Sequence, residues 1–240
     1  MSEINEERKD RLRQTEDYKK TKEIFDRLIS NVSYVSPMKV DLFPPSFRER
    51  LLTFEKNCVD FYEKWKESEK VSEILRGLKS EVSYDNNKLK SMSKMLAYLG
   101  LIESLGVALV DMTLILLIAN GKDVHIRWPY TKHATSFEDL ERIELGYKLD
   151  ILDAGGFDLF KKFMNRVVRN HIAHLKFTIQ NNGEIRKKDG SPIRIDEEIS
   201  RFWDGVDTIK LILDELRFFK TLEKLSSLKF EEKESALSHE

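Results

Sequence analysis

Arginine, amide and imidazole side chains gather in one short stretch, Arg166-Val167-Val168-Arg169-Asn170-His171-Ile172-Ala173-His174. The apolar residues that precede it recur at helical spacing, and this pattern predicts that the stretch lies on a helix. Asn170 and His174 are four residues apart and share a face, while Arg169 lies to the side with a stem long enough to reach the imidazole. Side chains placed in this way can bind a phosphate and transfer a proton.

These side chains suit RNA cleavage by attack of the 2′-hydroxyl group on the neighbouring phosphate. Imidazole groups exchange protons near neutral pH, so His174 would act as general acid or base. Arg169 would stabilise the charge that builds on the phosphate, and Asn170 would orient either group or bind a phosphate oxygen. Such a reaction needs no metal and leaves a cyclic phosphate. The competing interpretation is that Arg169 and His174 form a buried polar cluster that fixes helix packing.

The segment Arg169-Asn170-His171-Ile172-Ala173-His174 resembles the R-x4-6-H motif of the HEPN superfamily, in the form R-N-x-x-A-H. Members are small helical domains, and many are metal-independent ribonucleases that act as toxins, abortive-infection proteins or RNA-processing factors. The order of long apolar helix, motif helix, short hairpin and amphipathic helix is also similar, over roughly residues 88–225. The chain departs from one subtype at Lys176, where HEPN toxins paired with minimal nucleotidyltransferases carry a tyrosine.

Basic residues surround the motif and the predicted hairpin that follows it. Between Lys161 and Arg194 only Glu184 and Asp189 oppose nine basic side chains. The whole chain has a formal net charge of −1, which excludes a wholly cationic nucleic-acid coat but permits this local positive field. The field favours single-stranded RNA as the substrate. The residues predicted to bind it are Arg166, His171, Lys176, Arg186 and Lys187, and His171 is alternatively a second catalytic imidazole.

Metal and covalent chemistries have weaker support. His171 and His174 are three residues apart and can both reach one ion, but a third ligand would have to come from a distant part of the chain: His125, His133 or Asp111. The sequence contains no HExxH cluster and no Gly-rich phosphate loop, so no metal or other cofactor is predicted. The single cysteine, Cys58, excludes an internal disulfide and fits a reducing cytoplasm.

Asp111 and Glu103 interrupt the most apolar part of the chain, residues 95–119. The charge-free run after Asp111 is too short to span a bilayer, so we expect a buried helix in a cytoplasmic protein without a membrane contact. A buried carboxylate needs a partner. Asp111 is therefore predicted to orient the motif by pairing with one of its side chains, with a backbone cap or solvent exposure as alternatives. The candidate partners are Arg166, Arg169 and His174.

The remaining pattern predicts an all-α fold, a helical bundle of HEPN type with one small β-hairpin after the motif helix. Asn181-Asn182-Gly183 is a hairpin turn signal between two short alternating runs. The predicted organisation is a helical extension over residues 1–80, a HEPN-like domain over 81–230 and a disordered tail over 231–240. Helices are expected from Ile24, from Ser46, over Val71–Leu78, over Lys88–Asn120, from Ser136, through the motif and over Asp196–Leu225.

The leading prediction is a HEPN-like, metal-independent endoribonuclease in defence or a toxin system. The resemblance also implies a homodimer whose motif helices meet at a basic cleft, and a toxin would have a protein antitoxin or defence partner. Two other classes stay open. One is a non-catalytic HEPN-like module that binds RNA or nucleotide or scaffolds a partner, and the other is a structural helical interaction protein.

Overall fold

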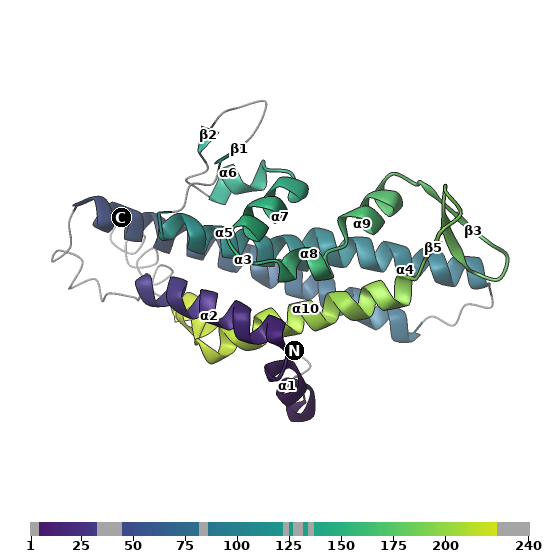
Figure 1. Cartoon of the computed structure of the whole chain (residues 1–240), viewed down its shortest axis with the longest axis horizontal. Coiled ribbons are helices and arrows are strands. Elements are labelled where there is room, and N and C mark those ends of the chain that lie inside the picture. The colour runs from purple at the N-terminus through teal and green to yellow at the C-terminus, as the bar shows by residue number, and fades with distance from the viewer. Residues whose placement is uncertain are drawn as a thin grey trace, which may run out of the picture.

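A computed structural model describes residues 5–32, 45–81, 86–121, 125–126, 132–133 and 137–224. This part of the chain is mostly helical, which confirms the all-α prediction (Figure 1). Its helices are α1 (Glu6–Arg13), α2 (Glu16–Asn31), α3 (Pro45–Glu81), α4 (Asn87–Leu101), α5 (Val107–Ala119), α6 (Phe137–Glu141), α7 (Leu145–Ala154), α8 (Leu159–Phe163), α9 (Arg166–Ala173) and α10 (Ile195–Glu215). A π-helical turn, Ile102–Gly106, joins α4 to α5.

The strands form two small antiparallel sheets. One pairs β1 (His125–Ile126) with β2 (Lys132–His133). The other has the order β3-β4-β5, from β3 (Phe177–Ile179), β4 (Ile185–Lys187) and β5 (Pro192–Ile193). The hairpin predicted after the motif is therefore present as β3–β4, with a third short strand added to it.

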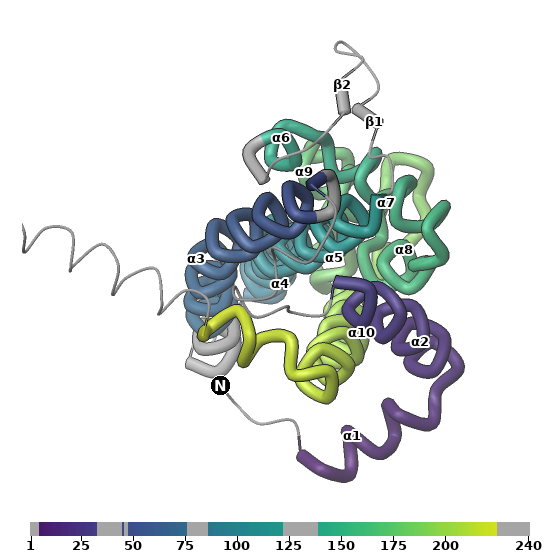
Figure 2. The backbone as a smooth tube through the Cα atoms, turned by 90° about the vertical axis from the view of Figure 1, so that its left-hand side faces the viewer, coloured from purple at the N-terminus to yellow at the C-terminus, as the bar shows by residue number. Residues whose placement is uncertain are grey.

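Helix α3 and the continuous rod made of α4, the π-helical turn and α5 run along the length of the molecule and form its middle (Figure 1). Helices α6, α7 and α9 lie on one side of this layer, and α2 and α10 lie on the other (Figure 2). The β3-β4-β5 sheet sits at the end of the molecule where α4 begins (Figure 1). The motif helix α9 lies between that sheet and α8.

One hydrophobic cluster extends from Leu12 in α1 to Leu222 after α10. Helix α5 is buried nearly all round, because its sequence is apolar on every face. The run Asn87–Ala119 is the one stretch among the described helices that is long and apolar enough to cross a membrane, and 78% of its most apolar window is buried inside the protein. Phe61 and Trp65 of α3 join the same cluster, so α3 shares the core with the predicted HEPN-like domain.

Several predicted helix boundaries are wrong. The separate helix expected at Val71–Leu78 is part of the continuous α3, in which the Ser72 hydroxyl donates to the Ser68 carbonyl one turn earlier. The helix expected from Ser136 is divided into α6 and α7. The last helix ends at Glu215 rather than Leu225, and a new helical segment, 218–224, follows a turn there. The predicted tail at 231–240 lies outside the described residues.

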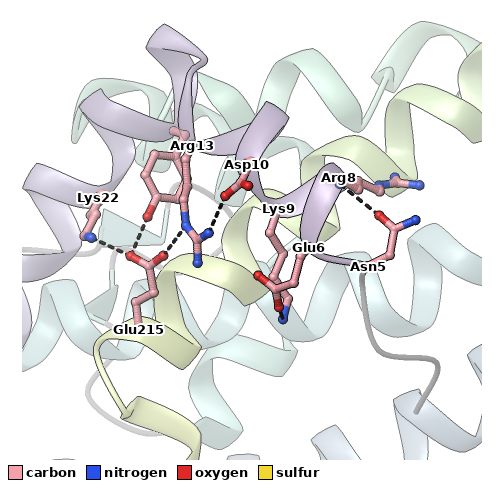
Figure 3. Close-up of polar contacts among 9 residues, drawn as sticks. Asn5, Glu6, Arg8, Lys9, Asp10, Arg13, Lys22 and Glu215 are labelled. Atoms are coloured by element: carbon pink, nitrogen blue, oxygen red, sulfur yellow. Dashed lines mark hydrogen bonds and ion pairs between the residues drawn. The ribbon is translucent and has the colours of Figure 1, made fainter.

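The N-terminal segment, expected to be a helical extension, forms two helices with capped starts. Asn5 Oδ1 accepts a hydrogen bond from the Arg8 amide at 2.8 Å at the start of α1. Glu215 near the end of α10 then accepts hydrogen bonds from Arg13 Nε at 2.9 Å, from the Tyr18 hydroxyl at 2.5 Å and from Lys22 Nζ at 2.5 Å (Figure 3). This one carboxylate ties both N-terminal helices to α10.

Candidate functional site

The motif occupies a short helix with defined ends rather than the end of a long one. The apolar run that precedes it breaks at Asn165, whose side chain caps α9 by accepting from the Val168 amide at 3.2 Å. Asn165 Nδ2 also donates to Glu198 of α10 at 3.1 Å, and this bond fixes the start of α9 against α10. Val168 and Ile172 are the buried side of the helix.

Helix α9 ends at His174 in a Schellman turn. The Lys176 amide donates to the His171 carbonyl at 2.8 Å, and the Leu175 amide donates to the Ile172 carbonyl at 3.1 Å. Leu175 has φ of +51°, a conformation that favours glycine at this position, and its side chain is 72% exposed. His174 therefore stands at the point where the motif helix turns into β3.

Both histidines of the motif have accessible imidazoles on one side of α9. His174 is exposed, and among the described residues its side chain makes no hydrogen bond or ion pair. The interpretation in which Arg169 and His174 form a buried cluster is therefore wrong. His171 Nδ1 donates to the Val167 carbonyl at 2.7 Å, since a carbonyl can only accept. That bond fixes the tautomer of neutral His171 and leaves Nε2 as its acceptor.

Arg169 is held by two partners. Its Nε and Nη2 contact Glu103 Oε1 at 2.6 and 2.5 Å, and its Nη1 donates to Asn170 Oδ1 at 3.1 Å. Two of the five guanidinium N–H groups thus donate hydrogen bonds and Nη2 adds an ion-pair contact, so that at least two N–H groups are left for a ligand. The predicted association of Arg169 with Asn170 is present, but no hydrogen bond in the described part of the chain links either of them to His174.

Glu103, which sequence reasoning did not assign to the site, lies in the π-helical turn. In this turn the Val107 amide donates to the Ile102 carbonyl five residues earlier. A side chain at Gly106 would come within 3.2 Å of Met164 Sδ, so glycine allows the start of the motif helix to pack closely there. π-Helical turns occur often at functional sites. The signal in the sequence was a carboxylate that interrupts an apolar helix.

The predicted RNA-binding residues divide into two groups. Arg166 points to α7, where its guanidinium covers Gly146 and lies 3.8 Å from Asp150. Arg186 donates to both carboxylate oxygens of Glu184, at 2.9 and 3.0 Å. Their charges are therefore partly neutralised within the protein.

The other group consists of cations with no partner in the described part of the chain. Lys176, Lys187 and Lys188 make no side-chain hydrogen bond or ion pair there. Phe177 pairs with Lys187 in the sheet, so all three lysines lie at the end of the hairpin nearest His174. Hydrogen bonds from Ser191 hold the pKa of nearby Asp189 below its usual value, and the charge of Lys187 lowers it further.

Asp111 does not have the predicted partner. Its Oδ1 accepts from Lys148 Nζ of α7 at 2.5 Å, and both side chains are buried. Burial raises the pKa of Asp111, although Lys148 opposes the shift. Arg166 and Arg169 pair elsewhere, so Asp111 does not orient the motif by the expected contact.

Among the described residues no group of three histidine, cysteine, aspartate or glutamate side chains comes together as a metal site. The side chains of His125 and His133, the distant candidate ligands, lie outside the described part. Comparison of the chain with protein-family models, with curated proteins and with solved structures finds no match. The functional interpretation therefore depends on the residues of the site and on the motif.

Proposed function

We propose that this chain is a HEPN-like, metal-independent endoribonuclease that cleaves single-stranded RNA, with a helical bundle of HEPN type as its fold. The observation that carries the proposal is the pair of accessible imidazoles, His171 and His174, on one side of a helix whose Arg169 guanidinium keeps two free donors. An acid, a base and a cation on one short helix suit phosphodiester cleavage.

The reaction follows from these groups. Neutral His171 accepts the proton of the 2′-hydroxyl at Nε2 while the 2′-oxygen forms a bond to phosphorus. Protonated His174 donates a proton to the 5′-oxygen as its bond to phosphorus breaks, which leaves a 2′,3′-cyclic phosphate and a free 5′-hydroxyl. Arg169 stabilises the charge on the non-bridging phosphate oxygens through its two free N–H groups, and Asn170 keeps the guanidinium in place.

The unpaired lysines extend the site along the RNA. Lys176, Lys187 and Lys188 would contact the phosphates next to the scissile bond, because they lie at the end of the hairpin that follows His174 and make no side-chain hydrogen bond or ion pair within the described residues. Arg166 and Arg186 would contribute less charge, since each already has an acidic neighbour.

We infer a homodimer through α9 as part of this proposal. Val167 and Leu175 are 56% and 72% exposed, and they flank the two histidines. Large exposed apolar side chains on either side of a polar site are typical of a covered surface. A two-fold axis there would set the two motifs face to face around the RNA.

The direct test is cleavage of labelled single-stranded RNA with and without EDTA. We expect full activity in EDTA, and loss of about 10²–10⁴-fold in the rate constant for His174→Ala. Arg169→Ala should lose about 10²–10³-fold. Lys19→Ala, on an exposed face of α2, is the matched control and should cleave normally. Activity that disappears in EDTA and returns with a divalent ion would contradict the mechanism.

A second candidate is a non-catalytic module that binds RNA or nucleotide. The ion pair between Arg169 and Glu103 favours it, because a carboxylate neutralises the cation that the reaction needs. RNA binding without cleavage under any condition would select this alternative. In either case we propose a cytoplasmic protein of a defence or toxin system, with an antitoxin or defence protein as partner.

A further inference from the structure

The tip of the β3–β4 hairpin carries an open depression of about 500 Å³. All of its lining residues are polar: Gln180, Asn181, Asn182, Glu184 and Arg186. Three of them carry a side-chain amide, which offers a donor and an acceptor side by side. No step of the cleavage reaction uses these amides.

The tip is fastened to the rest of the protein. The Ser91 hydroxyl of α4 donates to the Gly183 carbonyl at 2.6 Å. Gly183 has φ of +85°, and a side chain there would come within 3.0 Å of the Asn87 carbonyl oxygen, so the turn lies directly against α4. The turn is closed by a bond from the Gly183 amide to the Gln180 carbonyl at 3.0 Å. The side-chain amides are therefore carried by a turn whose position against α4 is fixed.

The polar groups of the depression differ in how many of their donors and acceptors are already hydrogen-bonded within the protein. Arg186 is held by Glu184 and donates from Nη1 to the Gly190 carbonyl at 3.1 Å, so its plane is fixed and its charge is balanced. Asn182 Oδ1 accepts from the Glu184 amide at 3.0 Å, which leaves its NH₂ group. The side-chain amides of Gln180 and Asn181 make no hydrogen bond within the described residues.

We propose that this depression binds an unpaired adenine base of the RNA strand. Glutamine and asparagine amides match adenine, which presents a donor next to an acceptor on both its Watson–Crick edge (N6–H and N1) and its Hoogsteen edge (N6–H and N7). A guanidinium plane is a common stacking surface for an unpaired base, and balanced charge makes Arg186 a poor phosphate ligand. Guanine would call for bidentate contact from a free arginine, whereas Nη2 of Arg186 is held by both oxygens of Glu184 and Nη1 donates to the Gly190 carbonyl.

The inference rests on the proposed function. The depression would give the ribonuclease a preference for adenine at a position several nucleotides from the scissile bond. Gln180 lies six residues after His174, so the two are at most about 20 Å apart along the chain. An RNA strand bound at His174 can thus place a base a few nucleotides away into the depression. Adenine at one fixed distance from the cleaved phosphate is the expected outcome.

The test uses the His174→Ala protein, which binds RNA without cutting it. Fluorescence anisotropy is measured with labelled U₁₂ and with U₁₂ that carries one adenine at successive positions. We expect a single adenine to tighten binding about tenfold at one position only. Gln180→Ala with Asn181→Ala should abolish this gain and leave the affinity for U₁₂ unchanged. Gln180→Glu, which keeps the shape of the side chain, should also lose it.

Lys188→Ala is the matched control, because it should weaken the binding of every oligonucleotide equally. Equal affinity for U₁₂ and for all adenine-containing strands would overturn the base preference. The proposed function would stand in that case if the unmutated protein still cleaves RNA. A preference that survives the double substitution would overturn its location. Absence of binding to any strand, together with absence of cleavage, would instead contradict the proposed function.

Discussion

Glu103 Oε1 accepts a hydrogen bond from Nε of Arg169 at 2.6 Å and forms an ion pair with its Nη2 at 2.5 Å, although 66 positions separate the two residues. The pair links the π-helical turn to the motif helix. It orients the guanidinium, and it also places a negative charge where an RNA phosphate would approach. Glu103 is 41% exposed and Arg169 28%, so solvent weakens the pair and a phosphate can compete with it.

We predict that Glu103→Gln binds RNA more tightly. Glutamine keeps an oxygen that can accept from Arg169 but removes the charge that opposes the phosphate. An exposed ion pair contributes about 0–1 kcal/mol, so the gain should be at most about fivefold in the dissociation constant. Anisotropy titrations in the His174→Ala background measure it.

Glu103→Ala provides the contrast. It removes the charge and also the acceptor, so Arg169 loses its fixed orientation while RNA can still bind. We expect tighter binding but slower cleavage than with Glu103→Gln, and single-turnover kinetics separate the two effects. Slower cleavage with both variants and unchanged affinity would show that the charge of Glu103 itself takes part in the reaction.

Leu175→Gly should weaken the homodimer without destabilising the protomer. Relief of the left-handed backbone should contribute about 1–2 kcal/mol, offset by about 0.5–1 kcal/mol of added chain entropy. The melting temperature of the monomer should therefore stay the same or rise slightly. Light scattering should give the 28.2 kDa chain mass for the variant and twice that mass for the unmutated protein.

The control for this change is Leu52→Ala, which removes another exposed leucine, 54% exposed, from α3. It should leave the mass unchanged. Mixing His174→Ala with Arg169→Ala protomers shows further whether two chains share one site. A monomer of the unmutated chain that cleaves RNA at full specific activity would rule out the dimer.

Local sequence patterns predicted the elements that depend on local chemistry. The apolar composition of α5 predicted burial, and Asn182-Gly183 predicted the turn of the hairpin, where the glycine has positive φ. Spacing also predicted that Arg169 and His174 belong to one helical segment, and α9 carries Arg169 with His174 as its C-cap. These features depend on neighbours in the sequence.

The missed features depend on contacts between distant segments. Helices α4 and α5 are separated by a π-helical turn where Gly106 makes room for Met164, and no local residue signals that contact. The partner of Arg169 is in the same turn. A buried carboxylate at Asp111 was predicted to need a cation, but several were available, and sequence distance does not identify Lys148.

The buried pair of Asp111 and Lys148 should contribute to stability rather than to activity. Lys148→Met leaves the carboxylate buried without its cation, and Asp111 Oδ2 already has no hydrogen-bond partner. We expect a loss of about 3–5 kcal/mol in the free energy of unfolding, measured by urea denaturation. The double variant Asp111→Leu, Lys148→Met should recover most of it. If the double variant recovers its stability but does not cleave RNA, Asp111 takes part in the function of the site.

Glu215 should make the attachment of the N-terminal helices sensitive to acid. Burial alone would raise its pKa, but hydrogen bonds from Lys22, Tyr18 and Arg13 lower it to about 2, against an ordinary value of 4.5 (Figure 3). A carboxyl group whose pKa is lower in the folded state stabilises the fold above about pH 4.5, and this contribution disappears as the pH falls towards 2.

The test compares melting temperatures of the unmutated protein and Glu215→Gln between pH 6 and pH 2.5. At pH 6 the variant should melt lower, and the difference should shrink as the pH falls, because the unmutated protein then loses the same contribution. Limited trypsin digestion at pH 6 should cut the variant first at Arg11 and Arg13, since α1 and α2 lose their common anchor on α10. Glu16→Gln, at an exposed pair with Lys19, is the matched control and should show neither effect. A difference in melting temperature that stays constant over the whole range would mean that Glu215 contributes by packing rather than by its charge.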